Sequence, residues 1–320
     1  MKNILLFFTV LFATGMQAQT KVWFDTDLMI GMPDKTPREV DDGITLIMAL
    51  KQPQIEIVGI SSITYVDYSY DVIHKIMDWH YEGPAIPVYK GSPEANDLGV
   101  ENDATRALYA ALKKEKLTIL ALGPMTNIAT LIQNHPDIIS QIDKISICAA
   151  RTPGLPFNPG NGKLNVFDYN YELDTKSMDV ILNSSIPLVF AGYEPSSYTH
   201  IGNIDFASLD LNEEADKWLF DIVQPWMKQN EQFFGVHGFI PFDCSTLGVI
   251  THPEYFTYHK NIPIKVTYKK NDALEVQPDT PYKNFLEVSY KFKTKKKVDY
   301  AIQALQGFEE KILETLSVKN

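Results

Sequence analysis

A group of carboxylates lies where an apolar run of the sequence gives way to a helical pattern. Residues 22–50 read VWFDTDLMIGMPDKTPREVDDGITLIMAL. Like charges at this density repel one another, so they are costly unless a cation lies among them or the loop is solvated. Hard oxygen ligands with no neighbouring set of histidines and cysteines suit Ca²⁺ or Mg²⁺ rather than zinc. The acidic residues of the stretch are Asp25, Asp27, Asp34, Glu39, Asp41 and Asp42.

The spacing of four of these aspartates favours the cation site. In a strand, Asp25 and Asp27 project to the same face, so both can point toward one site beyond the strand end. Asp41 and Asp42 would open the following helix, where the helix dipole favours negative charge. Taken alone, the second pair is more typical of a helix N-cap beside a solvated loop. The alternation of Asp25 and Asp27 therefore favours a cation site over a solvated loop.

The segment LTILALGPMTN predicts a free carbonyl group near the same place. Its letters are typical of a buried strand, a Gly-Pro turn and a helix. Pro124 suits the first helical turn, and the turn leaves the carbonyl of Leu122 outside any strand ladder. A backbone carbonyl at the edge of a sheet is a candidate cation ligand.

Two later segments add polar side chains. NPGNGKLNVFDYN contains Asn161, Asp168 and Asn170. It is either a turn-rich loop or a set of amides and acids that bond sugar hydroxyls in fixed directions. In GFIPFDCSTLGVI, Asp243 follows Phe242 and opens an apolar helix, where it would by itself be read as an N-cap.

The elements that would position these residues alternate between strand and helix. Several strand candidates are continuous apolar runs, as expected of strands buried on both faces. Repeated βα units predict an α/β fold with an open, mostly parallel sheet and helices on both faces. Ligands bind such sheets at the carboxyl ends of the strands, which is where the polar residues fall. The strand candidates are residues 22–25, 55–60, 86–89, 117–122, 144–148 and 186–191.

The last third of the chain differs from this alternation. We expect a long helix around residues 213–234, a hairpin region at 262–292 and a terminal helix from 298 to about 316. Trp79 and Trp226 are interpreted as core residues rather than as platforms for a ligand. No repeat or linker divides the chain, so residues 19–320 are expected to form one domain.

The N-terminus, MKNILLFFTVLFATGMQAQT, predicts a secretory signal peptide over residues 1–18. One lysine precedes an apolar run, and Met16-Gln17-Ala18 supplies the small-residue cleavage pattern. The apolar run is too short for a membrane span. We therefore expect a secreted or periplasmic protein.

Charge and cysteine content argue against several classes of protein. The chain has 29 basic and 40 acidic residues, a formal net charge of −11. That balance argues against binding to nucleic acid or to an anionic membrane. Cys148 and Cys244 are the only cysteines. Two thiols so far apart form neither a disulfide scaffold nor a paired-cysteine metal site.

In their order, these segments resemble the inosine–uridine-preferring nucleoside hydrolase family, from about Val22 to the end of the chain. The family begins with a strand that ends in a DxDxxxDD motif, and its TGPLTN segment is similar to LGPMTN here. Its ribose-binding EFN corresponds to DYN, and its late His-Asp pair corresponds to Phe242-Asp243. The residues that match the first motif are Asp25, Asp27, Asp41 and Asp42.

The resemblance implies an α/β nucleoside hydrolase fold and calcium-dependent hydrolysis of ribonucleosides to ribose and base. Asp27 would be the general base, with Asp25 in a supporting position. The implied partner is a small nucleoside, and the implied assembly is a homodimer or homotetramer. The Ca²⁺ ligands would be Asp27, Asp42, Asp243 and the carbonyl of Leu122. The substrate would meet Asp41, Asn161, Asp168, Asn170 and Phe242.

Several departures from the family pattern bear on this interpretation. Roughly ten extra residues separate the two halves of the aspartate motif, and the insert, residues 29–39, is either a lid, which we favour, or a surface excursion. Asp34 and Glu39 of the insert are alternative ligands, but Asp42 is preferred because it directly precedes the helical pattern.

Phe242 stands where many members have a histidine that can protonate the leaving base, so His237, Tyr65 and Tyr68 are considered as substitutes. Asp168 is one methylene shorter than the family glutamate.

Two other functions stay open at this point. One is a Ca²⁺-dependent sugar- or nucleoside-binding protein without catalysis on the same scaffold. The other is a haloacid dehalogenase-type phosphatase, in which Asp25 would be the nucleophile and Asp27 an acid/base with Mg²⁺. The phosphatase reading leaves the LGPMTN and DYN segments without a role.

Overall fold

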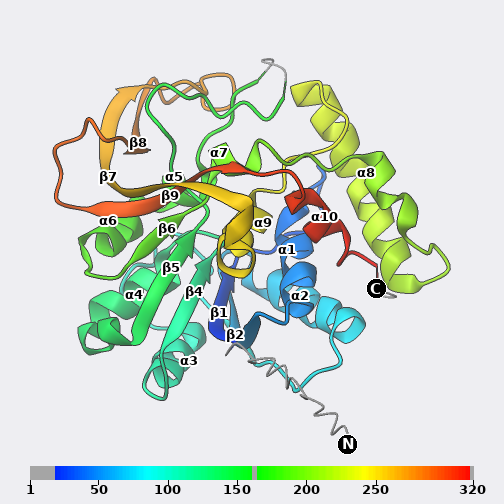
Figure 1. Cartoon of the computed structure of the whole chain (residues 1–320), viewed down its shortest axis with the longest axis horizontal. Coiled ribbons are helices and arrows are strands. Elements are labelled where there is room, and N and C mark those ends of the chain that lie inside the picture. The colour runs from blue at the N-terminus through cyan, green and yellow to red at the C-terminus, as the bar shows by residue number, and fades with distance from the viewer. Residues whose placement is uncertain (1–18, 161–163, 318–320) are drawn as a thin grey trace, which may run out of the picture.

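In the computed structural model, which describes residues 19–160 and 164–317, the strands join in one mixed sheet (Figure 1). Its order is β3-β2-β1-β4-β5-β6-β9-β7-β8. The first six strands and β9 run parallel, whereas β7 is antiparallel to β9 and β8. The predicted mostly parallel sheet is confirmed. The strands are β1 (Thr20–Thr26), β2 (Ile55–Ser62), β3 (Val88–Lys90), β4 (Leu117–Ala121), β5 (Ile142–Ile147), β6 (Leu188–Phe190), β7 (Phe256–Lys270), β8 (Tyr282–Val288) and β9 (Lys297–Ala304).

Helices cover both faces of the sheet, as predicted from the βα alternation (Figure 1). One layer contains α1, α2, α9 and α10, and the opposite layer contains α3, α4 and α6. Over the described residues, none of the helices has the length and apolar character needed to cross a membrane. The helices are α1 (Asp41–Leu50), α2 (Val66–His80), α3 (Asp103–Leu112), α4 (Thr126–Asn134), α5 (Tyr169–Leu173), α6 (Thr175–Asn183), α7 (Tyr193–Ser196), α8 (Glu214–Phe234), α9 (Phe242–Thr251) and α10 (Phe308–Leu313).

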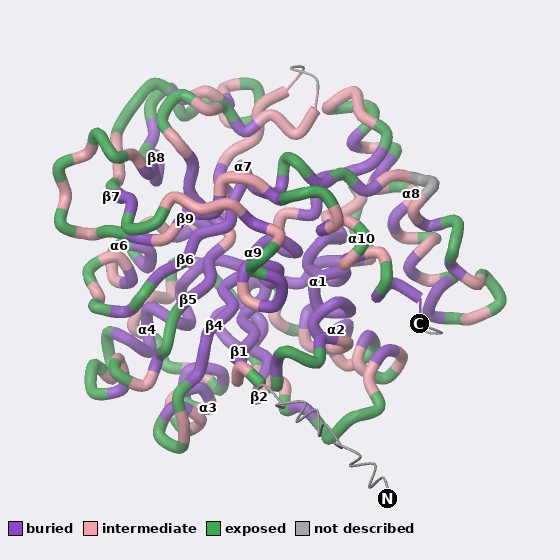
Figure 2. The backbone as a smooth tube through the Cα atoms, in the orientation of Figure 1, coloured by how far each residue is buried: buried purple, intermediate pink, exposed green. Residues whose placement is uncertain are grey.

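The central strands are buried on both faces, which explains their continuous apolar sequences (Figure 2). In β1, Val22 and Phe24 belong to the core under α1 and α9, whereas Trp23 between them belongs to the core under α3 and α4. Alternate side chains of one strand therefore fill two separate cores. Removal of this apolar surface from water is the main stabilisation of such a fold.

The expected terminal helix from 298 to about 316 is wrong. Residues 297–304 form β9, and only the short helix α10 follows. Val298, Ala301 and Leu305 have a helical spacing, but the segment lies between β6 and β7 and pairs with both. The unpaired backbone groups of those two strands outweigh the helical pattern, because buried N–H and C=O groups must find partners. Gly307, with φ +99°, separates the strand from α10.

Candidate active site

A cavity of about 250 Å³ opens at the carboxyl ends of four adjacent strands. Asp27 follows β1, Leu122 follows β4, Cys148 follows β5, and Gly192 lies two residues beyond β6. Helix N-termini complete the wall, since α1, α7 and α9 all begin at its lining residues. This is the edge of the sheet at which the sequence predicted a ligand-binding site. Of the predicted site residues, Asp27, Asp41, Asp42, Leu122, Asp168, Asn170, Phe242 and Asp243 line the cavity.

Among the described residues, one predicted site residue does not line it. Asp25 lies behind the cavity wall and is only 1% exposed. Its carboxylate accepts hydrogen bonds from Ser61 and from Asn127 Nδ2, the latter at 2.9 Å. A residue held in this way supports the site and is poorly placed to attack a phosphate, which argues against the phosphatase. Asn161 lies outside the described residues.

Part of the cavity is lined by carboxylates. Asp27 is 4% exposed, and its Oδ2 is buried without a hydrogen-bond partner among the described residues. Burial, reinforced by the charge of Asp41, raises the pKa of Asp27 to about 7. Burial also raises the pKa of Asp41 to about 6 and that of Asp243 well above its usual range. Such a cluster binds protons or a cation strongly.

The backbone holds two of these carboxylates in place. Asp42 accepts hydrogen bonds from the N–H groups of Met29 and Gly43, the latter at 2.6 Å. Asp41 Oδ2 accepts the N–H of Asp243 at 3.1 Å, so the start of α1 is tied to the start of α9. Each carboxylate also has lone pairs beyond those bonds, because an ionised carboxylate accepts about four.

The carbonyl of Leu122 is held by Asn170. Asn170 Nδ2 donates to Leu122 O at 2.9 Å and to Cys148 O at 3.1 Å, so one amide joins the ends of β4 and β5. Asp168 accepts the N–H of Ala150 at 2.8 Å, and its pKa is raised to about 6 by burial. The DYN segment thus fixes the site frame as well as lining the cavity.

The cluster fits a hard divalent cation by its donor chemistry. The donors are carboxylate oxygens and one carbonyl oxygen, and burial, followed by mutual repulsion, raises the pKa of several of the carboxyl groups. Within residues 19–160 and 164–317, however, no three His, Cys, Asp or Glu side chains already form a group that could hold a metal ion. The fit to a cation therefore rests on the donor chemistry of these residues.

The pKa shifts predict how the stability of the metal-free protein depends on pH. Asp27 titrates near 7 in the folded protein and near 4 when unfolded. The folded state therefore binds more protons between these values. The stabilisation that protonation of Asp27 contributes is fully present below pH 4 and is lost as pH rises through 7. In a chelator, we expect the Tm to fall by at least about 5 °C from pH 5 to pH 8, measured by calorimetry.

Calcium should reduce that fall, because a bound cation offsets the repulsion. Asp243→Asn should also flatten the pH dependence, because it removes one charge of the cluster. The matched control is Asp279→Asn, which changes an exposed aspartate that does not line the cavity. A Tm that rises from pH 5 to pH 8 in chelator would contradict the electrostatic description.

Gly123 brings the β4 turn against Asp27. A Cβ at position 123 would lie 2.8 Å from Ile63 Cγ2 and 3.0 Å from both Cβ and Cγ of Asp27. Gly123→Ala is therefore expected to displace Asp27 and to lower kcat about tenfold or more with little loss of structure. Steady-state kinetics with circular dichroism checks this. Gly202→Ala, where the nearest atom is 3.4 Å away, should leave kcat unchanged.

Another part of the cavity wall is aromatic. Phe157 stacks on Tyr193 with ring centroids 4.7 Å apart, and Phe242 lies 6.2 Å from Tyr193. Trp226 and Phe234 of α8 also line the cavity. Trp226 packs against the hydrophobic core, as interpreted from the sequence, and its half-buried side chain also forms part of this wall. Planar apolar faces of this kind can stack on a heterocyclic base.

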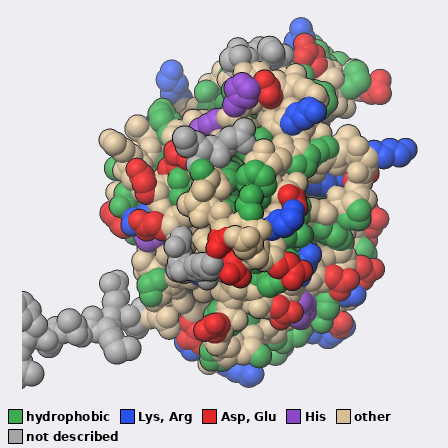
Figure 3. Space-filling model, turned by 90° about the vertical axis from the view of Figure 1, so that its right-hand side faces the viewer, with side chains coloured by type: hydrophobic (Ala, Val, Ile, Leu, Met, Phe, Trp, Pro, Cys, Tyr) green, Lys and Arg blue, Asp and Glu red, His purple; other side chains and the backbone are tan. Residues whose placement is uncertain are grey.

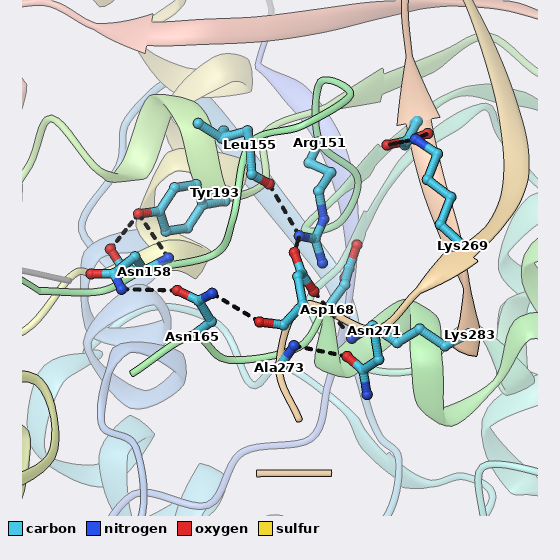
Figure 4. Close-up of polar contacts among 12 residues, drawn as sticks. Arg151, Leu155, Asn158, Asn165, Asp168, Tyr193, Lys269, Asn271, Ala273 and Lys283 are labelled. Atoms are coloured by element: carbon cyan, nitrogen blue, oxygen red, sulfur yellow. Dashed lines mark hydrogen bonds and ion pairs between the residues drawn. The ribbon is translucent and has the colours of Figure 1, made fainter. Parts of the chain in front are cut away.

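A polar network holds the loop that carries Phe157 (Figure 4). Tyr193 Oη donates to the carbonyl of Asn158, and Asn158 Nδ2 donates to Asn165 Oδ1 at 2.9 Å. Asn165 Nδ2 reaches the carbonyl of Asp272 at 2.8 Å, and Arg151 pairs with the Asp272 carboxylate at 2.6 Å. The two asparagines therefore brace the loop, as the turn-rich reading of this segment suggested.

The insert lies against α2 and α8. Tyr68 Oη donates to Ile30 O at 2.8 Å, and Gln229 of α8 donates to Pro37 O at 3.2 Å. Leu28 and Ile30 are fully buried, whereas residues 33–36 are exposed. Glu39 lines the cavity as a further carboxylate, which the sequence reasoning set aside in favour of Asp42.

None of the three groups considered as substitutes for the leaving-group histidine lines the cavity. Tyr68 is bonded to Ile30, and the His237 side chain is 76% exposed beside Glu231. Tyr65 lies on the surface with Arg38 over its ring.

On the face shown in Figure 3, the visible Lys and Arg side chains lie among acidic and apolar ones rather than in a continuous basic patch.

Comparison with known proteins gives one consistent result. The family model described as inosine-uridine preferring nucleoside hydrolase matches residues 22–278. A probable uridine nucleosidase 1 of Oryza sativa subsp. japonica is 24% identical over 260 residues, 70% of this chain and 77% of that protein. The pyrimidine-specific ribonucleoside hydrolase RihA of Salmonella typhi is 26% identical over 235 residues, 70% of this chain and 69% of that protein.

Solved structures show the same fold. The purine-preferring ribonucleoside hydrolase from Gardnerella vaginalis superposes with a TM-score of 0.71 and 20% identity, over 93% of this chain and 98% of that one. An inosine-uridine preferring nucleoside hydrolase from Bacillus anthracis gives a TM-score of 0.68 and 15% identity, over 93% of this chain and 99% of that one.

Proposed function

Because the chain belongs to the inosine–uridine preferring nucleoside hydrolase family, a family of N-glycosyl hydrolases, we propose that it cleaves ribonucleosides to ribose and free base with Ca²⁺. The observation that supports this is a single cavity lined both by a cluster of carboxylates and by a group of packed aromatic rings. The hydroxyl groups of a ribose can donate hydrogen bonds to carboxylates and coordinate a cation, whereas a heterocyclic base can stack on flat apolar rings. The non-catalytic binder shares these features and is distinguished by the assay below.

Asp27, Asp42, Asp243 and the carbonyl of Leu122 would hold the ion. When bound, Ca²⁺ would lower the pKa of a water molecule and orient it together with the sugar hydroxyls. Asp27 would accept the proton of that water as it attacks C1′, since its Oδ2 faces no competing donor among the described residues. Asp41, Asp168 and Asn170 would bind ribose, and the carboxylates would stabilise the positive charge that develops on the sugar.

The assay is release of reducing sugar from a panel of nucleosides and from p-nitrophenyl riboside. It is run with Ca²⁺, after chelation, and after Ca²⁺ is restored. The proposal expects activity that disappears in chelator and returns with Ca²⁺. Calcium binding without turnover of any substrate would identify the binder instead.

The lid interpretation of the insert also becomes a defined experiment. Replacing the exposed residues 33–36 by two glycines should raise KM several-fold, because the change disturbs the adjoining Arg38 and Glu39. The Tm should change little, because Leu28 and Ile30 retain their core contacts. Unchanged kinetics would show that the insert is a surface excursion.

A further inference from the structure

One face of α8 lies along the aromatic part of the cavity wall. Trp226, Asn230 and Phe234 are spaced by four residues, and all three line the cavity. Residues at this spacing share one side of a helix. Trp226 and Phe234, one turn to either side of Asn230, are aromatic, so Asn230 is the polar side chain of an otherwise apolar face of α8.

The amide of Asn230 has a defined orientation. The side chain is 3% exposed, and its Nδ2 donates to the carbonyl of Trp226 at 2.9 Å. Because that carbonyl can only accept, the NH₂ group must face it and Oδ1 must point the other way. No described residue donates a hydrogen bond to this Oδ1.

A fixed acceptor on an otherwise apolar helix face selects for a donor. An acceptor that a ligand desolvates without pairing carries a penalty, whereas an N–H placed opposite gains a bond in a low-dielectric site. At neutral pH a lactam base carries such a donor on its ring, as in the N3–H of uridine and the N1–H of inosine. A methyl group on that nitrogen removes the donor and adds bulk.

Resting on the nucleoside hydrolase function proposed above, we propose that Asn230 reads the ring N–H of a lactam base and thereby sets base specificity. Trp226 positions Asn230 through its backbone carbonyl and offers its ring to the base. This role differs from that of the carboxylates, which meet the ribose. An asparagine that served only the helix, by bonding the carbonyl one turn earlier, would not distinguish substrates.

The test compares uridine with 3-methyluridine, with p-nitrophenyl riboside as a substrate that has no lactam. In the unmodified protein with Ca²⁺, kcat/KM for uridine should exceed that for 3-methyluridine by at least about tenfold. Asn230→Ala should lower kcat/KM for uridine at least about tenfold, and should bring the two nucleosides to within about threefold of each other. Its kcat/KM for p-nitrophenyl riboside should stay within about twofold.

The matched control is Lys228→Ala, an exposed position on the same helix, which should preserve the preference for uridine. Equal losses on all substrates in Asn230→Ala would overturn the inference and show a structural role. Equal cleavage of uridine and 3-methyluridine by the unmodified protein would also overturn it. Absence of p-nitrophenyl riboside cleavage in the unmodified protein would instead reject the proposed hydrolase function.

Discussion

Asp27→Asn is expected to lower kcat for p-nitrophenyl riboside by about 10³-fold or more. The change removes the base that would take the proton of the attacking water, and it removes a charged ligand of the cation. Asp243→Asn should cause a loss of the same order through the cation alone. Calcium titration by calorimetry should show weaker binding in both variants, because a hard ion needs charged oxygens.

Asp25→Asn tests whether Asp25 is a supporting residue rather than a ligand of the metal ion. Asp25 is bonded to Ser61 and Asn127 outside the cavity, so this variant should retain more calcium than Asp27→Asn. Asp279→Asn, at an exposed position that does not line the cavity, should behave like the unmodified protein. Full activity of a calcium-free Asp27→Asn protein would reject the site.

The second large effect concerns the leaving group. A departing base leaves more readily when it is protonated, and Phe242 cannot donate a proton. We therefore expect kcat/KM for p-nitrophenyl riboside to exceed that for inosine and uridine by about 10²-fold or more, since nitrophenolate needs no acid. Steady-state kinetics on the three substrates measures this ratio.

Phe242→His should reduce the difference in kcat/KM between p-nitrophenyl riboside and the two natural nucleosides. The ring at this position lines the cavity beside Tyr193, and an imidazole there would supply the missing donor near neutral pH. Tyr193→Phe is a poor control because its hydroxyl braces Asn158, so the control is Phe233→His on the exposed side of α8. Comparable kcat/KM for inosine and p-nitrophenyl riboside in the unmodified protein would point to an acid elsewhere in the cavity.

The sequence predicted the sheet edge well because its signals are local. Asp27, Leu122 and Asp168 each lie directly after a strand or before a helix, and apolar runs mark those boundaries. Parallel strands then bring their carboxyl ends to one edge whatever their separation in sequence. Most of the carboxylate residues of the cavity could therefore be predicted from the sequence.

The aromatic part of the cavity wall could not be predicted in the same way. Trp226 and Asn230 belong to a long helix whose docking depends on contacts with the insert and with the loop of Phe157, and no local pattern reports such contacts. Asn170 was expected to meet a sugar and does line the cavity, but its amide also bonds the two strand ends, a role that the sequence did not predict. That bond depends on the distance between β4 and β5, which a sequence does not display.

The placement of β9 determines the order in which this molecule can be completed. The strand lies between β6 and β7, although it follows β7 and β8 in the chain. During synthesis the hairpin of β7 and β8 therefore emerges before the strand that joins it to the parallel sheet. Pairings between segments far apart in sequence form slowly, and until then the edge of β6 is open to other strands. A chain that ends before residue 297 would carry every carboxylate of the site on an unfinished sheet, exposed to aggregation and proteolysis.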